Sequence, residues 1–306
     1  MGKWHEILDH YGLPEITGNK HFNGPCPLCG KKKKFRIDNK SDMGTWICIC
    51  GAGGGIELVV EKTGRDYSEI CSEIDELIGN KSDANTEMIM LRNAHENKLK
   101  EFFKMQEIPN TPVEYYLKSR GINLLPTSSL RFSQKEFSGY GSPEMPAMYG
   151  IATTNKNQII YNHCTYLIGC EKARIEAPKK MFTVRQYSGS TAIKLFNSAD
   201  KMGISEGIES ALSAAQLYSI PVWSTINSGF MKKFRAPDDV VHLVIYADND
   251  TNGTGLEAAF ACGRSNILRN PKTRSVEIIW PLETGDFNDI LINKISAETR
   301  SWTLTK

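Results

Sequence analysis

The stretch "VHLVIYADNDTNGTG" at residues 241–255 decides the class of fold, because an apolar run ends abruptly in two carboxylates. The run is as long as one strand, and its continuous apolar character is typical of a strand buried on both faces of a parallel sheet. Asp248 and Asp250 follow it one residue apart, and residues i and i+2 of an extended chain point the same way. The two carboxylates can therefore hold one cation, with Asn249 pointing away from it, although the pair alone is also compatible with a solvated turn or a helix cap.

The residues around this stretch alternate between strand and helix patterns. Predicted strands cover residues 201–206, 221–227, 240–248 and 275–281. Helices are predicted between them at residues 207–219 and 253–270. This alternation indicates an α/β fold, a parallel sheet flanked by helices, whose ligands bind at the carboxyl ends of the strands.

A third acid, Glu206, ends the first of these strands just before Gly207. Three carboxylates at neighbouring strand ends repel one another unless a cation compensates them, and hard oxygen ligands select Mg²⁺ or Mn²⁺. Asp286, which follows the last predicted strand, is a fourth candidate ligand, whereas Asp289 is expected to cap or face the next helix. The sequence thus predicts a catalytic divalent-metal site formed by Glu206, Asp248 and Asp250, with Asp286 beside it.

Four of the eight cysteines gather near the N-terminus as Cys26-x2-Cys29 and Cys48-x-Cys50. Two close cysteine pairs joined by a β-rich loop are typical of one structural zinc ion held by four thiolates. The single residue inside the second pair tightens its bite, and His21 is an alternative ligand. The scattered Cys71, Cys164, Cys170 and Cys262 are expected to be buried, reduced packing residues.

A basic run lies beside this cysteine cluster. Its predicted contacts to nucleic acid are Lys31, Lys32, Lys33, Lys34, Phe35 and Arg36, with Trp46 across the ribbon. Cations bind phosphates and aromatic rings stack on bases, a combination typical of single-strand binding. A lysine run alone more often marks a solvated turn, and its attachment to a metal ribbon with aromatic residues favours contact with nucleic acid.

The rest of the chain connects these two regions. Helices are predicted at residues 3–11, 67–78 and 88–106, with a polar linker over 79–87. Thr111 and Pro112 can open a further helix that ends at Gly121. Short β-prone runs, among them residues 147–153, 158–169, 181–187 and 191–196, dominate residues 130–200, which predicts an α+β intermediate region.

The composition of the 306 residues is ordinary, with 24% charged and 40% hydrophobic residues and a net charge of +2. This charge is too small to imply nucleic-acid binding, so any basic surface must be local. No run is long enough to cross a membrane, and the N-terminus lacks the apolar core of a signal peptide. We therefore expect a cytoplasmic protein with no membrane partner.

Several segments along the chain carry a family resemblance. "ISEGIESALSA" at residues 204–214 and "VIYADNDTNGTGLEAA" at residues 244–259 resemble the two signatures of the Toprim domain, a glutamate and then a D-x-D motif after successive strands. The ribbon "HFNGPCPLCG" at 21–30 with "GTWICICGAGGGIELV" at 44–59 resembles that of phage- and plasmid-encoded primases of the satellite-phage alpha type, as do segments between residues 111 and 182. The resemblance covers nearly the whole chain in the same order.

Three departures accompany this resemblance. The ribbon has C-x-C where such primases usually have C-x-x-C, and Ser210 stands where some replicative primases have a further aspartate. Glu209 is adjacent to that position but is expected to point elsewhere on its helix. The chain has no G-x-x-x-x-G-K-[ST] motif, so unwinding is expected to come from a separate replicative helicase.

The resemblance implies a DNA primase, a DNA-directed RNA polymerase that makes primers from NTPs on single-stranded DNA for phage, plasmid or other mobile-element replication. It implies a zinc-ribbon template-binding domain over residues 1–80, a linker and helix over 81–107, part of the polymerase core over 108–200 and a Toprim catalytic domain over 201–306. Candidate contacts to template or triphosphate are Lys172, Lys179, Lys180 and Arg185, which could equally be solvated strand-edge residues.

Two other functions use the same residues. A Toprim nuclease would use the same acids to hydrolyse phosphodiesters, although a template-binding ribbon is not expected in front of it. A DNA-binding replication accessory would keep the domain for structure only. A topoisomerase is not expected, because it would need a tyrosine nucleophile and a gate larger than 306 residues allow.

Overall fold

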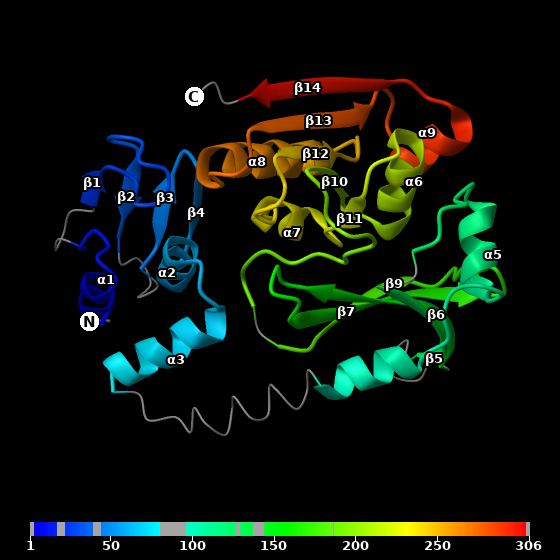
Figure 1. The fold of residues 1–306 in the computed structure, drawn as a ribbon, viewed down its shortest axis with the longest axis horizontal. Coiled ribbons are helices and arrows are strands. Elements are labelled where there is room, and N and C mark those ends of the chain that lie inside the picture. The colour runs from blue at the N-terminus through cyan, green and yellow to red at the C-terminus, as the bar shows by residue number, and fades with distance from the viewer. Residues whose placement is uncertain are drawn as a thin grey trace. The chain divides into compact units, whose positions relative to one another are not determined.

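The computed structural model describes residues 3–16, 22–38, 44–79, 96–126, 129–136, 144–185 and 187–303, and the chain divides into two compact units (Figure 1). The N-terminal unit comprises Met1–Met90 with Tyr187–Gly189, and the C-terminal unit comprises Leu91–Gln186 with Ser190–Lys306. The predicted fold class, a parallel-containing α/β sheet with a small β-rich metal ribbon and an α+β region, is confirmed. The finer boundaries at 81–107, 108–200 and 201–306 stay predictions.

Within its described residues, the N-terminal unit is a small antiparallel sheet with three helices. Its strands pair in the order β1-β2-β3-β4 and are β1 (Phe22–Gly24), β2 (Phe35–Ile37), β3 (Trp46–Cys48) and β4 (Gly51–Gly53). Its helices are α1 (Trp4–His10), α2 (Gly55–Thr63) and α3 (Tyr67–Leu77). The helices α1 and α3 were predicted, but α2 was not, although Glu57 accepts a hydrogen bond from the Gly54 backbone N–H at 2.9 Å and so closes its first turn.

The C-terminal sheet holds five strands in the order β11-β10-β12-β13-β14. They are β10 (Lys201–Ser205), β11 (Val222–Ser224), β12 (His242–Tyr246), β13 (Ser275–Pro281) and β14 (Ala297–Thr303). The first four in this order are parallel, as predicted, and β14 closes the edge antiparallel to β13. The sequence analysis missed β14, because its residues "AETRSWT" are mostly polar and a solvent-facing edge strand lacks the apolar signature of a central one.

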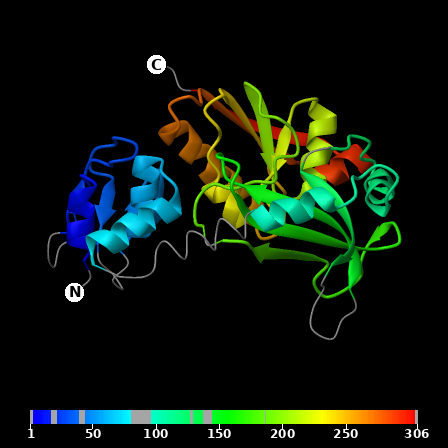
Figure 2. The same ribbon diagram turned by 60° about the horizontal axis from the view of Figure 1, so that its bottom comes forward.

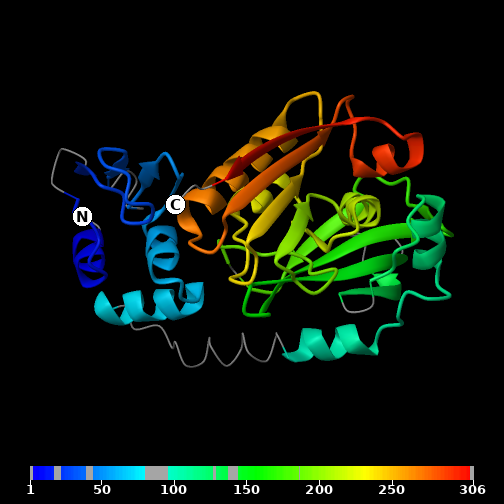
Figure 3. The ribbon, with the colours of Figure 1, turned by 45° about the horizontal axis from the view of Figure 1, so that its top comes forward.

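Helices cover both faces of this sheet (Figure 3). They are α6 (Ile208–Tyr218), α7 (Ser228–Lys233), α8 (Thr254–Arg269) and α9 (Phe287–Asn293). Leu243 and Ile245 of β12 pack into one core cluster with α7 and α8. Tyr246 contacts the rings of Tyr218 in α6 and Phe287 in α9, each at a centroid distance of 4.9 Å, on the other face. Successive residues of β12 therefore serve opposite cores, which explains its unbroken apolar run.

A second, antiparallel sheet precedes the C-terminal one in the chain. It is formed by β5 (Leu130–Glu136), β6 (Met145–Thr153), β7 (Ile159–Ile168), β8 (Glu171–Lys172) and β9 (Lys179–Thr183). A helix that the structure describes over residues 96–104 lies across one face of this sheet, where Phe102 joins the core with Tyr149 and Cys164 (Figure 2). The predicted start of this helix at residue 88, like the linker from residue 80 onward, lies outside the described residues.

The segment over residues 191–196, predicted as a strand, instead forms two isolated bridges. Ala192 pairs with Thr153 of β6, and Ile193 pairs with Ser224 of β11. One short segment thus joins the end of β6 in the antiparallel sheet to the edge strand β11 of the C-terminal sheet. The helix α5 (Pro112–Ser119) begins after Thr111 and ends before Gly121, whose φ of +72° suits glycine, as predicted.

None of the described helices combines the length and the hydropathy that crossing a bilayer would require.

The strand β7 buries a histidine, and we predict that it weakens the fold in mild acid. His163 is 5% exposed, and burial lowers its pKa to about 4, assisted by Lys179 and Lys172 and opposed by Glu209. The unfolded chain, with a histidine pKa near ~6.5, then binds the extra proton first, so stability present at pH 7 is lost as the pH falls from about 6.5 toward 4. Between pH 7 and pH 5 this residue should cost about 2 kcal/mol of unfolding free energy.

The measurement is urea unfolding followed by circular dichroism at both pH values for the wild type, His163→Gln and the exposed control His5→Gln. The His163→Gln variant should lose less stability on acidification than the other two. Equal losses in all three proteins would contradict the assignment.

Candidate active site and zinc centre

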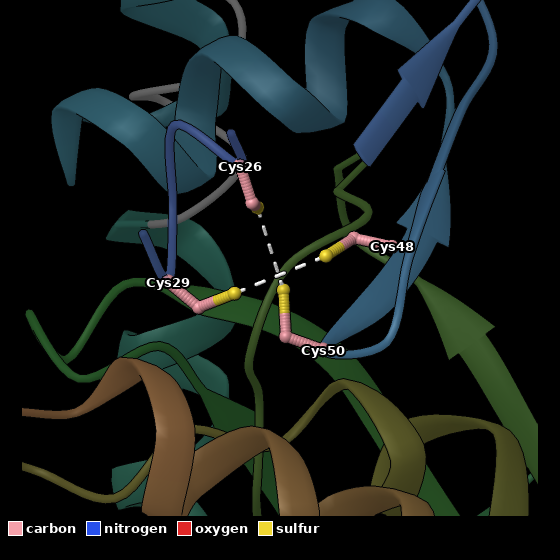
Figure 4. Close-up of side chains that lie close together, drawn as sticks. All are labelled: Cys26, Cys29, Cys48 and Cys50. Atoms are coloured by element: carbon pink, nitrogen blue, oxygen red, sulfur yellow. Dashed lines mark hydrogen bonds between the residues drawn. The ribbon is translucent and has the colours of Figure 1, made fainter. Parts of the chain in front are cut away.

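Four cysteine thiols meet in the N-terminal unit (Figure 4). The Sγ atoms of Cys26 and Cys50 lie 3.7 Å apart and those of Cys29 and Cys48 lie 3.8 Å apart, while all four lie within 4.8 Å of one another. A tetrahedral zinc ion with Zn–S bonds of about 2.3 Å separates its sulfurs by about 3.8 Å. The donor set and its spacing therefore fit one structural Zn²⁺.

The local backbone explains how the irregular second pair reaches the site. Cys48 ends β3 and pairs with Gly51 of β4, so Cys50 lies in the two-residue turn of that hairpin and points back toward Cys26. The first pair lies in a tight turn in which the Gly30 N–H donates to the Cys26 carbonyl at 2.9 Å. The hairpin turn therefore directs both thiols of the C-x-C pair to the same site, as the loop of a C-x-x-C pair does. The alternative ligand His21 lies outside the described residues.

The predicted nucleic-acid surface of the ribbon needs correction. Lys31, Lys32, Lys33, Lys34 and Arg36 are all exposed. Phe35 and Trp46, however, are 0% and 4% exposed and stack on each other at 6.0 Å, so the expectation that they present free rings to bases is wrong. The alternating pattern of β2 and β3 turns these rings into the core and leaves Arg36 opposite the exposed Ile47 on the outer face.

The four remaining cysteines are not all buried as expected. Cys164 and Cys262 are buried, Cys71 is half-buried and Cys170 is exposed. Cys170 lies in the turn between β7 and β8, where no core is available to cover it.

The predicted acids follow neighbouring parallel strands of the C-terminal sheet. Glu206 comes directly after β10, and Asp248 comes two residues after β12. The two strands pair in register, with Ser205 opposite Tyr246, so both acids lie at one edge of the sheet. Among the described residues only the cysteines form a compact group of ligand atoms, so the carboxylates are more widely spaced. Mg²⁺ in proteins usually keeps several waters and is bound by one or two carboxylates together with substrate phosphates, so a site for it does not require all these acids to contact the ion directly.

Asp248 is the centre of this acid cluster, which comprises Glu206, Asp248, Asp250 and Asp286. Its Oδ1 atom is buried and has no hydrogen-bond partner among the described residues. Burial, together with the nearby Asp286, Glu206 and Asp250, raises the pKa of Asp248 to about 8, while Lys179 acts in the opposite direction. Burial and Asp250 also raise the pKa of Glu206. The cluster carries an excess of negative charge, and the unpartnered oxygen fits a divalent cation.

Asp286 lies at this edge because a loop is held in place by Asn249. The Asn249 Nδ2 donates to the carbonyls of Pro281, Glu283 and Leu282 at 3.0, 3.2 and 3.4 Å. Its side chain thus points away from the acids, as predicted. Asp286 is the N-cap of α9, accepting from the Asn288 and Asp289 N–H groups, and Asp289 caps in return. The expectation that Asp289 caps or faces this helix is therefore confirmed, and Asp286 joins it in one capping box.

Asp250 is fixed by the start of α8. Its carboxylate oxygens lie 3.3 and 3.4 Å from the Gly255 N–H. A Cβ atom at residue 255 would lie 2.4 Å from the Asp248 backbone oxygen, so only glycine allows this helix to begin so close to the acids.

Two predicted basic residues reach the same region, and they reveal an acid that sequence reasoning set aside. Lys179 Nζ lies 2.9 Å and Lys172 Nζ 3.2 Å from the buried carboxylate of Glu209. The only sequence signal was the position of Glu209 in the first turn of α6, one turn after Glu206. Lys180 and Arg185 are half-buried, and their contacts to template or triphosphate stay predictions.

Comparison with known families agrees with this arrangement. Residues 21–56 match the zinc-binding domain of primase-helicase, and residues 201–297 match the Toprim domain. This chain carries a primase zinc ribbon and a Toprim domain. Between them, residues 93–191 match a domain of unknown function (DUF7146). The zinc ribbon therefore contains the four cysteines, and the Toprim domain contains the acid cluster.

Solved structures give distant similarities with primases. The chain is similar to the Aquifex aeolicus primase, zinc-binding and RNA polymerase domains, with 13% identity over 96% of this chain and 84% of that one, and a TM-score of 0.40. For the primase fragment of the bacteriophage T7 primase-helicase protein the identity is 12%, the shares are 90% and 96%, and the TM-score is 0.39. For the E. coli primase catalytic core the identity is 11% over 67% of this chain and 77% of that one, and the TM-score is 0.44.

We predict that zinc supports the fold of the N-terminal unit. In a small unit, the binding free energy of a structural metal is largely folding free energy. Cys50→Ser should remove close to one equivalent of zinc per chain, measured by elemental analysis, and make residues 3–79 sensitive to limited proteolysis. Cys170→Ser, which changes an exposed cysteine outside the cluster, should keep its zinc. Full zinc content in Cys50→Ser would contradict the four-thiolate site.

Proposed function

We propose that this chain is a DNA primase that synthesises short RNA primers from NTPs on single-stranded DNA. One observation carries the proposal: the buried, unpartnered Oδ1 of Asp248 lies among three further acids at the strand ends of a Toprim domain. The primase zinc ribbon in the same chain supports this reaction over others available to Toprim acids.

Each region has a separate role in the proposed reaction. Glu206, Asp248 and Asp250 would hold Mg²⁺ or Mn²⁺, with Asp286 beside them, and this cation when bound compensates the charge of the triphosphate and the leaving pyrophosphate. The acids themselves are fixed by paired strands, a helix start and a clamped loop, so they need little rearrangement to receive it. Phosphoryl transfer depends on such placement and charge compensation rather than on a covalent nucleophile.

The zinc ribbon would bind the template. Lys31, Lys32, Lys33, Lys34 and Arg36 form an exposed basic surface suited to the phosphates of a single strand. Because Phe35 and Trp46 are buried, this surface would act through charge more than through stacking. The resemblance to phage- and plasmid-encoded primases supports a role in replication of a mobile element, with unwinding supplied by a separate helicase.

The decisive experiment incubates the protein with single-stranded DNA, labelled ribonucleotides and Mg²⁺ or Mn²⁺. The wild type should make short oligoribonucleotides that depend on the template. Asp248→Asn should reduce synthesis at least about a hundredfold, since the central ligand charge is lost, whereas Asp238→Asn, an exposed aspartate of the same domain, should be unchanged.

Other products would point to the other functions. Degradation of the template instead of synthesis would favour a Toprim nuclease. Neither product, with DNA binding retained, would favour a replication accessory.

A second prediction concerns the ribbon surface. Lys32→Gln with Lys34→Gln should weaken binding to single-stranded DNA, measured by fluorescence anisotropy at several salt concentrations. Removing one lysine–phosphate interaction lowers the slope of log affinity against log salt by about 0.7, so the pair of substitutions should lower it by about 1.4. The control pair, exposed Lys272→Gln with Lys294→Gln, should leave the slope unchanged. Equal slopes in both double variants would remove the ribbon lysines from the template site.

A further inference from the structure

A buried carboxylate that the proposed reaction does not use lies beside the acid cluster. Glu209, in the first turn of α6, has a side chain only 4% exposed. It accepts a hydrogen bond from the Tyr116 hydroxyl at 2.8 Å and contacts Lys179 Nζ at 2.9 Å and Lys172 Nζ at 3.2 Å. These partners come from α5, β9 and β8, so one acid joins three separate elements to the Toprim domain.

Glu209, Lys172 and Lys179 together carry a net positive charge. Burial raises the pKa of Glu209, but Lys179 and Lys172 lower it well below its usual range, so the carboxylate is ionised. Two ammonium groups and one carboxylate leave one positive charge in excess. A buried carboxylate without these cations would be strongly unfavourable, so the three groups are held together as a set.

The excess charge faces the acid cluster. The Lys179 side chain is 37% exposed, and its Nζ lies 3.8 Å from the point where a Cβ atom of Gly207 would stand, next to Glu206. Burial lowers the pKa of Lys179, while Glu209, Asp286 and Asp248 raise it, and on balance it is raised. An ammonium group therefore lies within electrostatic reach of the proposed metal ligands and remains accessible to an anion.

We propose that Glu209 is a positioning residue that holds Lys179, with Lys172 beside it, where the lysine meets the polyphosphate of an incoming nucleoside triphosphate. This inference rests on the proposed function. A free lysine would lose the freedom of four side-chain bonds on binding phosphate, and a buried carboxylate that fixes the ammonium group in advance avoids most of that loss. The same contacts could instead serve only to brace the two sheets, and the experiment separates these roles.

The test combines two independent measurements, one of catalysis and one of binding. One is the KM for ribonucleotides in primer synthesis. The other is the dissociation constant of inorganic tripolyphosphate with Mg²⁺ in excess, measured by titration calorimetry, which needs no catalysis. The variants are Glu209→Gln, Lys179→Gln and both together, with Lys201→Gln as a surface lysine control at the opposite end of β10.

If Glu209 acts through Lys179, each single variant should raise both constants about tenfold, as expected for one charge-assisted contact. The double variant should then be no worse than Lys179→Gln alone, kcat should fall less than KM rises, and the affinity for single-stranded DNA should be unchanged. Additive effects in the double variant would overturn the inference, because Glu209 would then not act through the lysine.

Two further outcomes would also overturn it. Unchanged tripolyphosphate binding with a lowered unfolding midpoint would leave only a structural brace. Weakened DNA binding with unchanged tripolyphosphate binding would assign the lysine to the template phosphates.

If Glu209→Gln does not fold, Glu209→Asp keeps the charge but withdraws the carboxylate by one methylene, and it should also weaken tripolyphosphate binding. Normal binding in that variant would contradict the inference. Failure of the wild type to make primers would remove the proposed function, whereas the tripolyphosphate measurement would still decide whether Glu209 positions an anion-binding lysine.

Discussion

Repulsion between carboxylates at one sheet edge is the constraint on which the rest of the C-terminal unit depends. The register of β10 and β12 brings Glu206 and Asp248 to the same edge, and burial makes their mutual repulsion more costly than it would be in water. Nothing in the local sequence can relieve this repulsion. Positive charge must come from elsewhere, and Lys179 of the antiparallel sheet supplies part of it.

This requirement explains why the two sheets share one compact unit. Without the antiparallel sheet, Glu206 and Asp248 would lack the positive charge that Lys179 places near them. Glu209 is paired with Lys172 and Lys179 of the antiparallel sheet, and these contacts join that sheet to the first turn of α6. The bridges made by Ala192 to the end of β6 and by Ile193 to the edge strand β11 link the same two sheets.

Much of this arrangement could be predicted because short-range patterns determine it. The apolar run before Asp248, the glycine after Glu206 and the two cysteine pairs each indicate local geometry that the structure contains. Contacts between residues far apart in the sequence could not be predicted in this way. The partners of Glu209 lie 30, 37 and 93 residues away along the chain, at Lys179, Lys172 and Tyr116, and no periodicity records such a contact.

Errors in the ribbon have a different physical origin. In a strand of three residues, a shift of one position moves a side chain from the buried face to the exposed face. The sequence "KKKKFR" has no alternating pattern that shows which face Phe35 occupies. A small unit needs its few large side chains inside, and Phe35 and Trp46 meet that need. Scarcity of apolar residues was thus a better guide to their position than their basic neighbours.

The hydrogen bonds made by the Asn249 side chain also make the site sensitive to deamidation of this residue. One amide group donates to three successive carbonyl oxygens of the loop that leads to Asp286. Slow hydrolysis of that amide would replace the donor by a carboxylate, and three attractions would become three repulsions without any change in size. The result would be a fifth acid at an edge already crowded with four, so the chemical lifetime of a single side-chain amide sets a limit on the integrity of the site.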